Sequence, residues 1–197
     1  MSTTYVCIAS GPSLTAADCE LVRQSGLPTI AVNSSWQLAP WCDHLYAGDL
    51  AWWDEHADEV PPSPQRWSCT RQAVAKHGLN YHEAYGAYNS GLRAIQLAFK
   101  LGAEGVLLLG YDCTVAGGTH WHGDHVGTKN PDEALCRKWK AQHAALAQRG
   151  SVVNCSRETE LECYRLGMLE KELTGAATVD RVHLSSYKCP ASPEGQG

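Results

Sequence analysis

Short apolar runs of strand length recur along the chain and alternate with longer amphipathic stretches. The runs are rich in aliphatic residues and bounded by turn residues, which is typical of strands buried on both faces of a parallel sheet. They cover Tyr5–Ala9, Thr29–Val32, His44–Ala47, Val106–Leu109 and Val152–Asn154. An alternation of strand and helix patterns predicts the α/β class, with a mainly parallel sheet and helices on both faces.

The stretches between the runs carry apolar residues at helical spacing. Three such sets stand out: Leu14, Ala17, Leu21 and Val22; Leu92, Ile95, Ala98 and Phe99; and Leu135, Trp139, His143 and Leu146. Thr15 with Asp18 three residues later predicts a capping box, and Asn130 before Pro131 predicts the start of the last long helix. Gly26 suits a left-handed helix end.

The composition fits a globular protein and limits its partners. The 197 residues are 44% hydrophobic and 19% charged, and the formal net charge is -5. That charge gives no electrostatic footprint for bulk nucleic-acid binding. The chain lacks the ~18 to 20 continuous apolar residues of a membrane helix, and from residues Met1–Thr4, which carry no basic region, we expect no signal peptide. We therefore expect a cytoplasmic protein without membrane insertion.

The domain organisation predicted from these patterns is simple. One Rossmann-like α/β domain covers residues 1–184, and the Ser-, Pro- and Gly-rich residues 185–197 form a flexible tail. The nine cysteines show no paired spacing, which favours reduced, buried thiols over disulfides or a Cys-based metal site. The sequence leaves the oligomeric state open, including a homo-oligomer.

Two loops have the composition of phosphate-binding turns. Ser10-Gly11-Pro12-Ser13 follows the first apolar run, and Asn89-Ser90-Gly91 opens a helical stretch. Glycine permits close backbone approach, and the free amides at a helix start suit an anion. Neither loop is a dinucleotide fingerprint or a P-loop, and each is equally consistent with an ordinary tight turn.

Polar residues end four of the predicted strands. Ser10, Asn33, Asp49 and Asp112 each follow an apolar run. Because the carboxyl ends of parallel strands meet at one edge of the sheet, these residues predict a polar cleft there. Trp36, Trp41, Trp52 and Trp53 lie near that cleft in sequence; ordinary packing is the favoured interpretation, and stacking on a sugar or base is the alternative.

A histidine cluster raises a separate metal hypothesis. His120, His122, Asp124 and His125 form an H-x-H-x-D-H pattern, which is the ligand signature of metallo-β-lactamase-fold hydrolases. That fold also needs a downstream His in a Gly/Thr-rich turn, then an Asp and a last His. Here His143 lies on a predicted helix, and only Asp180 and His183 follow it, in an unsuitable context. The alternative kept is a zinc site at His120, His122 and Asp124, with metal-dependent hydrolysis as its activity.

Taken together, these landmarks resemble the bacterial sialyltransferases with a Rossmann-like fold. The motility accessory factor glycosyltransferases and the 6-hydroxymethylpterin diphosphokinase-like proteins are similar as well. The resemblance runs from about Val6 to Ser156. Its landmarks are the Gly-Pro-Ser-Leu loop, Asn33, Asp49, Ser90-Gly91, Gly110-x-Asp112, a His ahead of Lys129-Asn130, and the polar strand end at Asn154 and Ser156.

The resemblance implies a glycosyltransferase that binds a nucleotide or nucleotide-sugar and requires no metal. It implies His125 as general base, with Asp112 and His122 as further catalytic residues. His120 or His122 would steady the leaving phosphate, for which the family's tyrosine pair is missing. The implied nucleotide-binding residues are Ser10, Gly11, Pro12, Ser13, Asn33, Asp49, Asn89, Ser90, Gly91, Gly110, Asn154 and Ser156.

Two further activities stay open. Asp49 stands where the sialyltransferases have Asn, and with Asp112 it could hold Mg²⁺ on ATP, as pyrophosphoryl transfer of the 6-hydroxymethylpterin diphosphokinase type requires. A nucleotide-binding module without catalysis is the other alternative. The acceptor is equally open: a glycan, a small metabolite or a modified base fits the sequence.

Overall fold

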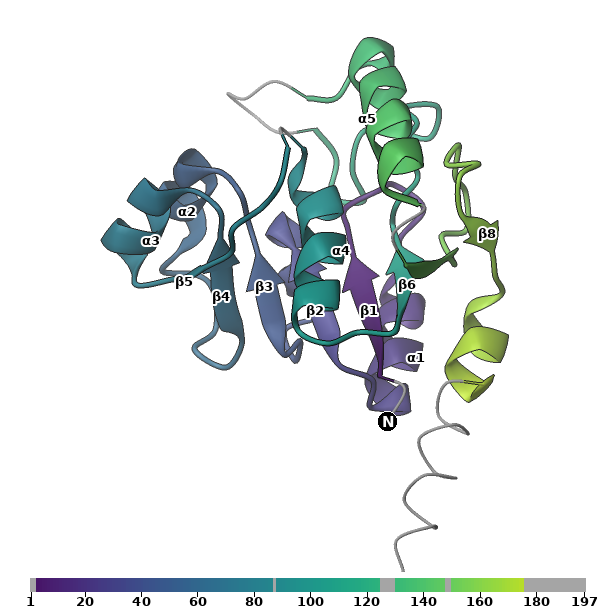
Figure 1. Ribbon diagram of the computed structural model, residues 1–197, viewed down its shortest axis with the longest axis horizontal. Helices are drawn as coiled ribbons and strands as arrows, with labels where there is room; N and C mark the ends of the chain where they lie inside the picture. Colours follow the sequence, from purple (N-terminus) through teal and green to yellow (C-terminus); the bar gives the residue numbers. More distant parts are fainter. Residues whose placement is uncertain (1–2, 87, 125–129, 148–149, 176–197) are drawn as a thin grey trace, which may run out of the picture.

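One continuous sheet of eight parallel strands organises the molecule (Figure 1). The computed structural model describes residues 3–86, 88–124, 130–147 and 150–175. The strands are β1 (Thr4–Ile8), β2 (Thr29–Val32), β3 (His44–Tyr46), β4 (Gln65–Ser68), β5 (Asn80–Tyr81), β6 (Gly105–Leu109), β7 (Ser151–Asn154) and β8 (Arg165–Leu166). Their order is β5-β4-β3-β2-β1-β6-β7-β8.

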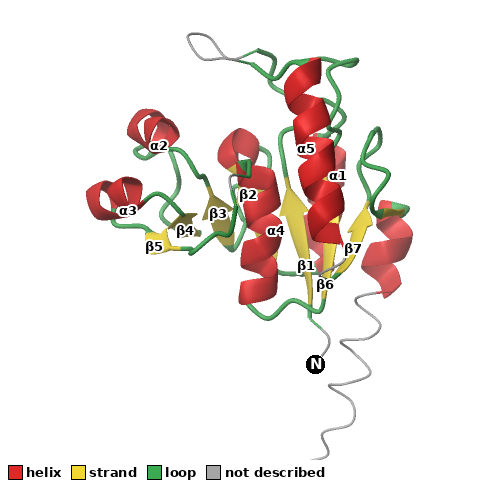
Figure 2. Ribbon diagram, turned by 45° about the horizontal axis from the view of Figure 1, so that its top comes forward, coloured by secondary structure: helices red, strands yellow, loops and turns green. Residues whose placement is uncertain are grey.

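Helices cover both faces of this sheet. The connections that lead from β1 to β5 contribute α1 (Ala16–Ser25), the 3-10 helix η1 (Asn33–Gln37), α2 (Leu50–His56) and α3 (Arg71–His77). The opposite face carries α4 (Ser90–Lys100) and α5 (Glu133–Leu146). Figure 2 shows α4 and α5 in front of the strands and α1 behind them. The predicted Rossmann-like α/β class is therefore confirmed.

The strand pleat divides the core into two layers. Val6 and Ile8 pack on the side of α1, whereas Cys7 between them packs on the side of α4 and α5. The same alternation separates Leu107 from Leu108 in β6. Because successive side chains of a strand point to opposite faces, an unbroken apolar run is what a strand covered on both sides needs. All five predicted runs form strands.

Three strands were not predicted from the sequence, and one helix starts later than predicted. β4, β5 and β8 are short and largely polar, and β5 and β8 are the two edge strands of the sheet, so they lack the apolar signal. The last long helix begins at Glu133, later than the Asn130–Pro131 pair suggested. Asp132 caps it, accepting a hydrogen bond from Leu135 N at 2.8 Å. The predicted caps at Thr15 and Gly26 are confirmed.

The buried face of α1 also differs from the prediction, because it includes a carboxylate. Ala17 is exposed, whereas Asp18 is buried and both of its oxygens accept hydrogen bonds from Arg157, each at 2.8 Å. Burial raises the pKa of Asp18, but the bonds from Arg157 and Thr15 outweigh it and hold that pKa below its usual value. This ion pair ties the first turn of α1 to the segment after β7.

The strand order reverses direction beside β1. The chain steps outward from β1 to β5 on one side, then crosses α4 and continues with β6, β7 and β8 on the other side. Such a switch point leaves a crevice at the carboxyl ends of its two central strands, where ligands bind in open α/β sheets. Among the described residues, no helix is long and apolar enough to cross a membrane, and the eight described cysteines form no disulfide.

Candidate functional site

A cavity of about 340 Å³ lies at this switch point, a volume within the usual range of small-molecule sites. Its walls come from the loops after β1, β2, β3 and β6, from the start of α4 and from α5. The lining residues are Ala9–Pro12, Val32, Asn33, Asp49, Tyr88–Gly91, Arg93, Gly110–Thr114, Thr119, His120, Pro131, Leu135, Cys136, Trp139, His143 and Leu161.

The loops after β1 and β6 approach each other very closely at the floor of the cavity. Gly11 N donates to Gly110 O at 2.8 Å. A Cβ atom on Gly11 would stand 2.4 Å from Asp112 Oδ1 and 2.5 Å from Gly110 O, which no side chain tolerates. Gly110 has a left-handed φ of 67°, and its own Cβ would meet Ala9 O at 2.3 Å. Both glycines are thus required by the packing of the two loops.

Asp112 binds the first loop instead of standing free in the cavity. Its Oδ2 accepts from Ser13 N at 2.7 Å and its Oδ1 from the Ser13 hydroxyl at 2.8 Å. The residue is 1% exposed. Burial raises the pKa of Asp112 above its ordinary value, and the bonds from Ser13 only partly offset this. The Asp112 carboxylate therefore fixes the conformation of the Ser10–Ser13 loop.

The start of α4 brings helix amides and one cation to the opposite wall. Asn89 caps the helix by accepting from Leu92 N at 2.8 Å, and Ser90 Oγ accepts from Gly48 N at 3.0 Å. The amides of the first helical turn have no partner within the helix and carry partial positive charge. Arg93, one turn in, donates to Cys69 Sγ at 2.9 Å, and its buried Nε has no hydrogen-bond partner among the described residues. This wall favours an anion.

Two strained residues line the same cavity. Asn33 and Cys113 are the non-glycine residues with positive φ in the described chain, at 49° and 54°. Asn tolerates this region more readily than Cys does. The buried Asn33 Oδ1 also lacks a hydrogen-bond partner among the described residues. Strained backbone and unsatisfied polar atoms concentrate at binding sites, where a ligand completes them.

The α5 wall has a different character. Leu135, Trp139 and His143 face the cavity from successive turns, and Leu161 adds a further apolar side chain. His143 Nδ1 lies 2.9 Å from the Tyr164 hydroxyl. The cavity therefore has a polar end at the loops and α4, and a mainly apolar, aromatic end at α5.

The histidine loop, which carries His120 and His122, contacts the Ser10–Ser13 loop after β1. Ser10 Oγ hydrogen-bonds His120 Nδ1 at 3.1 Å, and Trp121 N donates to Ser10 O at 3.1 Å. The Asp124 carboxylate accepts from the Thr119 hydroxyl at 2.5 Å. The His120 and His122 rings stack with centroids 5.1 Å apart. Within the described part of the chain no three His, Cys, Asp or Glu residues gather as a metal would need, and His125 lies outside that part.

The structure brings most of the predicted nucleotide-binding residues together. Ser10, Gly11, Pro12, Asn33, Asp49, Asn89, Ser90, Gly91 and Gly110 all line the cavity, as do Asp112 and His120. Ser13, His122, Asp124, Asn154 and Ser156 do not. Asn154 and Ser156 instead bind the backbone of Tyr111, which itself lines the cavity. Ser156 Oγ accepts from Tyr111 N at 2.8 Å, and Asn154 Nδ2 donates to Tyr111 O at 3.4 Å.

The cavity is also lined by residues for which the sequence predicted no ligand-binding role. Arg93, Cys113, Trp139 and His143 belong to this group. Trp139 and His143 carry a helical periodicity that indicates a buried face, and nothing in the pattern distinguishes a cavity wall from a core. Arg93 follows the predicted Asn89-Ser90-Gly91 loop by about one helical turn. That spacing could have indicated that its side chain lies near the predicted anion site.

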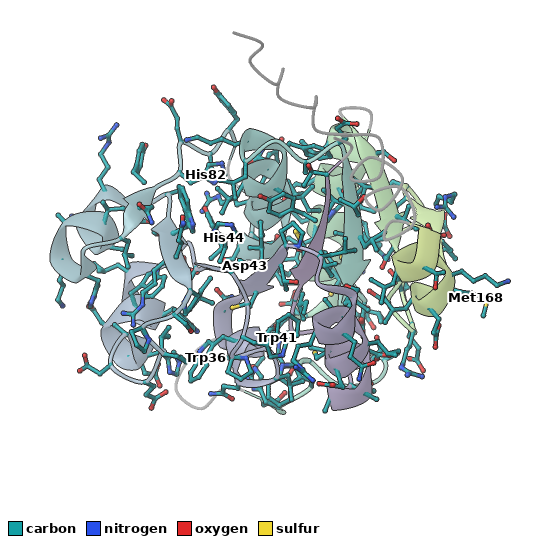
Figure 3. All side chains as sticks on the ribbon, turned by 90° about the horizontal axis from the view of Figure 1, so that it is seen from below. Trp36, Trp41, Asp43, His44, His82 and Met168 are labelled. Carbon is teal, nitrogen blue, oxygen red and sulfur yellow. The ribbon has the colours of Figure 1, made fainter. Side chains whose placement is uncertain are left out.

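The tryptophans near the strand ends do not form part of the cavity lining. Trp53 is fully buried and donates from Nε1 to Ala47 O at 2.9 Å, whereas Trp36, Trp41 and Trp52 pack against the α1-side core. Figure 3 shows Trp36 and Trp41 on the α1 side of the sheet and His82 on the α4 side. The stacking alternative for these four tryptophans is therefore wrong for this cavity; the tryptophan that lines it is Trp139.

No family model, curated protein or solved structure matches the chain. The resemblance to the sialyltransferases and their relatives thus stays a prediction from the sequence landmarks.

Proposed function

We propose that this protein binds the nucleotide part of an activated sugar in the cavity and transfers the sugar to an acceptor. The observation that carries the proposal is the division of the cavity into an anion-favouring end at α4 and the Gly11 loop, and an aromatic end at α5. A nucleotide has the same division, with phosphates at one end and a flat heterocycle at the other. The position at the switch point of a Rossmann-like sheet supports it.

The phosphates lie in this proposal between the α4 amides and Arg93. Arg93 supplies a guanidinium that can donate to two phosphate oxygens. Ser10 and Asn33, on the loops after β1 and β2, offer polar groups for the ribose or the transferred sugar. Asp112 is a positioning residue, because both of its oxygens already accept hydrogen bonds from Ser13.

The chemical step follows from the sequence resemblance, with His125 as general base. The acceptor oxygen attacks the anomeric carbon of the sugar while the bond from that carbon to the phosphate oxygen breaks. The acceptor's proton passes to His125, and the bonding electron pair leaves with the nucleotide phosphate, which the α4 wall stabilises. His120, hydrogen-bonded to Ser10, brings the histidine loop to the cavity.

The test is turnover of nucleotide sugars by the full chain in the presence of chelator. CMP-, UDP- and GDP-linked sugars are supplied singly, and free nucleotide is measured with and without hydroxyl acceptors. We expect one donor class to be consumed, with loss of turnover in His125→Ala and Arg93→Gln. Arg71→Gln, an exposed arginine on α3 outside the cavity, is the matched control and keeps full activity.

The contrary outcomes name the competing functions. Conversion of ATP to AMP with Mg²⁺, and no consumption of nucleotide sugars, would make the protein a diphosphokinase. Tight nucleotide binding without turnover of any donor would make it a binding module.

A further inference from the structure

The α5 end of the cavity is built around one buried histidine. His143 is 2% exposed, and its ring is held edge-to-face between the rings of Tyr111 and Tyr164, with centroids 6.0 and 5.6 Å away. Tyr111 is itself fixed, because its hydroxyl donates to Gly91 O at 2.9 Å. Packing on two sides restrains the orientation of the ring, as a specificity contact requires.

The hydrogen bond to Tyr164 determines which atom His143 offers. Burial lowers the pKa of His143 to about 4, so the ring is neutral near pH 7 and one nitrogen donates while the other accepts. The bond that Tyr164 makes is to His143 Nδ1, at 2.9 Å. If the phenol donates in this bond, the ring proton is on Nε2. Since Nδ1 is turned to Tyr164 and His143 lines the cavity, Nε2 is the ring nitrogen that remains available to a ligand there.

The surroundings of this donor suit a flat heterocycle. Leu135, Trp139 and Leu161 supply apolar surface around His143. A sugar needs many hydrogen-bond partners, whereas a nucleobase needs an aromatic or apolar slot with few polar contacts. The polar partners that a sugar needs gather at the other end of the cavity.

We propose that the α5 end is a nucleobase subsite, in which Trp139 packs on the base and His143 Nε2–H donates to a base carbonyl oxygen. The inference rests on the proposed nucleotide binding and adds its selectivity. Uracil, cytosine and guanine carry such a carbonyl oxygen, and adenine does not. The donor is then a nucleotide of one of those three bases.

Calorimetry on the full chain tests the subsite with UMP, CMP, GMP, AMP and ribose 5-phosphate. We expect the best carbonyl-bearing nucleotide to bind at least about tenfold more tightly than ribose 5-phosphate, because base stacking and a hydrogen bond are added. His143→Phe brings that nucleotide to the affinity of AMP, a loss of roughly five- to tenfold. Trp139→Ala removes most of the difference between nucleotides and ribose 5-phosphate.

Two controls separate lost recognition from lost folding. The double variant His143→Phe with Tyr164→Phe removes both partners of the buried hydrogen bond, so that no polar group is left unsatisfied. It is expected to keep the ribose 5-phosphate affinity and to lack base preference. Lys138→Gln, an exposed change on α5, leaves all affinities unchanged. In nitrogen-labelled protein, the His143 spectrum should show the Nε2–H tautomer and respond to the preferred nucleotide alone.

The failures are distinguishable. Unchanged base preference in both His143 variants, or an Nδ1–H tautomer, would overturn the subsite while leaving nucleotide binding intact. If ribose 5-phosphate and all four nucleotides fail to bind, the proposed function falls as well.

Discussion

Ser13 and Asp112 are joined by two hydrogen bonds across 99 residues of chain, one from the Ser13 backbone nitrogen and one from its hydroxyl. The pair connects the loop after β1 with the end of β6, the two strands that flank the switch point. Asp112 is of a residue type that can act as a catalytic acid, but here both of its oxygens hold the loop after β1. We call this pair of hydrogen bonds the Ser13–Asp112 clamp. The cavity floor depends on this clamp, because Gly11 is pressed against the same carboxylate.

A double-mutant cycle measures the clamp. Ser13→Ala removes the hydroxyl donor and Asp112→Asn replaces one of the two acceptor oxygens with an NH2 donor, so each should lower the unfolding free energy by about 1–3 kcal/mol. Because the residues share one interaction, the double variant should lose clearly less than the sum of the single losses. Urea unfolding followed by circular dichroism gives these values, with the exposed Ser63→Ala as control. Additive losses would show that the two residues act independently.

The close approach of the loops can be tested by alanine substitution at Gly11, with the same substitution at Gly117 as the control. An added Cβ at Gly11 meets Asp112 Oδ1 at 2.4 Å, whereas at Gly117 the nearest atom is Pro12 Cγ at 3.7 Å, an ordinary contact. We expect Gly11→Ala to lower the melting temperature by several degrees and to abolish nucleotide binding, and Gly117→Ala to do neither. Equal behaviour of the two variants in a thermal shift assay would refute the clash.

Acid should destabilise the fold through its buried histidines. Burial lowers the pKa of His82 and of His143 to about 4, from an unfolded value near 6.5. As the pH falls from 6.5 towards 4, the unfolded chain takes up protons that the folded chain refuses. Stability is therefore complete above pH 6.5 and is lost below it, by roughly 1 kcal/mol per pH unit for each histidine.

Urea unfolding between pH 7.5 and 5 checks this dependence. His143→Phe with Tyr164→Phe should reduce the slope, because one titrating group is removed, while His82 and His44, whose pKa values burial also lowers, remain. A flat stability profile from pH 7 to 5 would contradict the assignment.

Chelator should leave the protein and its activity unchanged. The Asp124 carboxylate accepts a bond from Thr119, and His120 Nδ1 is bonded to Ser10, so these ligand atoms already have partners. We expect EDTA to alter neither the melting temperature nor the consumption of nucleotide sugar. Stoichiometric zinc in the purified protein, lost in His122→Ala together with stability, would instead support the metal hypothesis for the histidine loop.

The sequence predicted the central architecture because its signals were strong there. The strands β1, β2, β3, β6 and β7 are buried on both faces, and a strand in that position has to be an unbroken apolar run. The capping residue Thr15 accepts a hydrogen bond from Asp18 N within the same turn, so its role could be inferred from the spacing of these two residues alone. The polar strand ends then indicated the edge of the sheet at which the cavity lies.

The remaining features depend on contacts that no local pattern records. Asp18 is buried because Arg157, 139 residues later, pairs with it. Trp139 and His143 look like core positions, and the cavity beside them exists because the loops after β1 and β6 meet α5 there. The edge strand β5 and its neighbour β4 are paired on few residues and carry polar side chains, so tertiary context determines them.

The most direct test of the central claim is a thermal shift of the full chain and of Arg93→Gln with CMP, UDP, GDP and ATP. Each nucleotide is measured in chelator and in Mg²⁺. We expect one mono- or diphosphate to stabilise the natural protein without metal, by about 2.7 kcal/mol at a hundred times its dissociation constant, and to bind Arg93→Gln roughly tenfold or more weakly. If no nucleotide raises the melting temperature, or if Arg93→Gln responds like the natural protein, the cavity is not the nucleotide site described above.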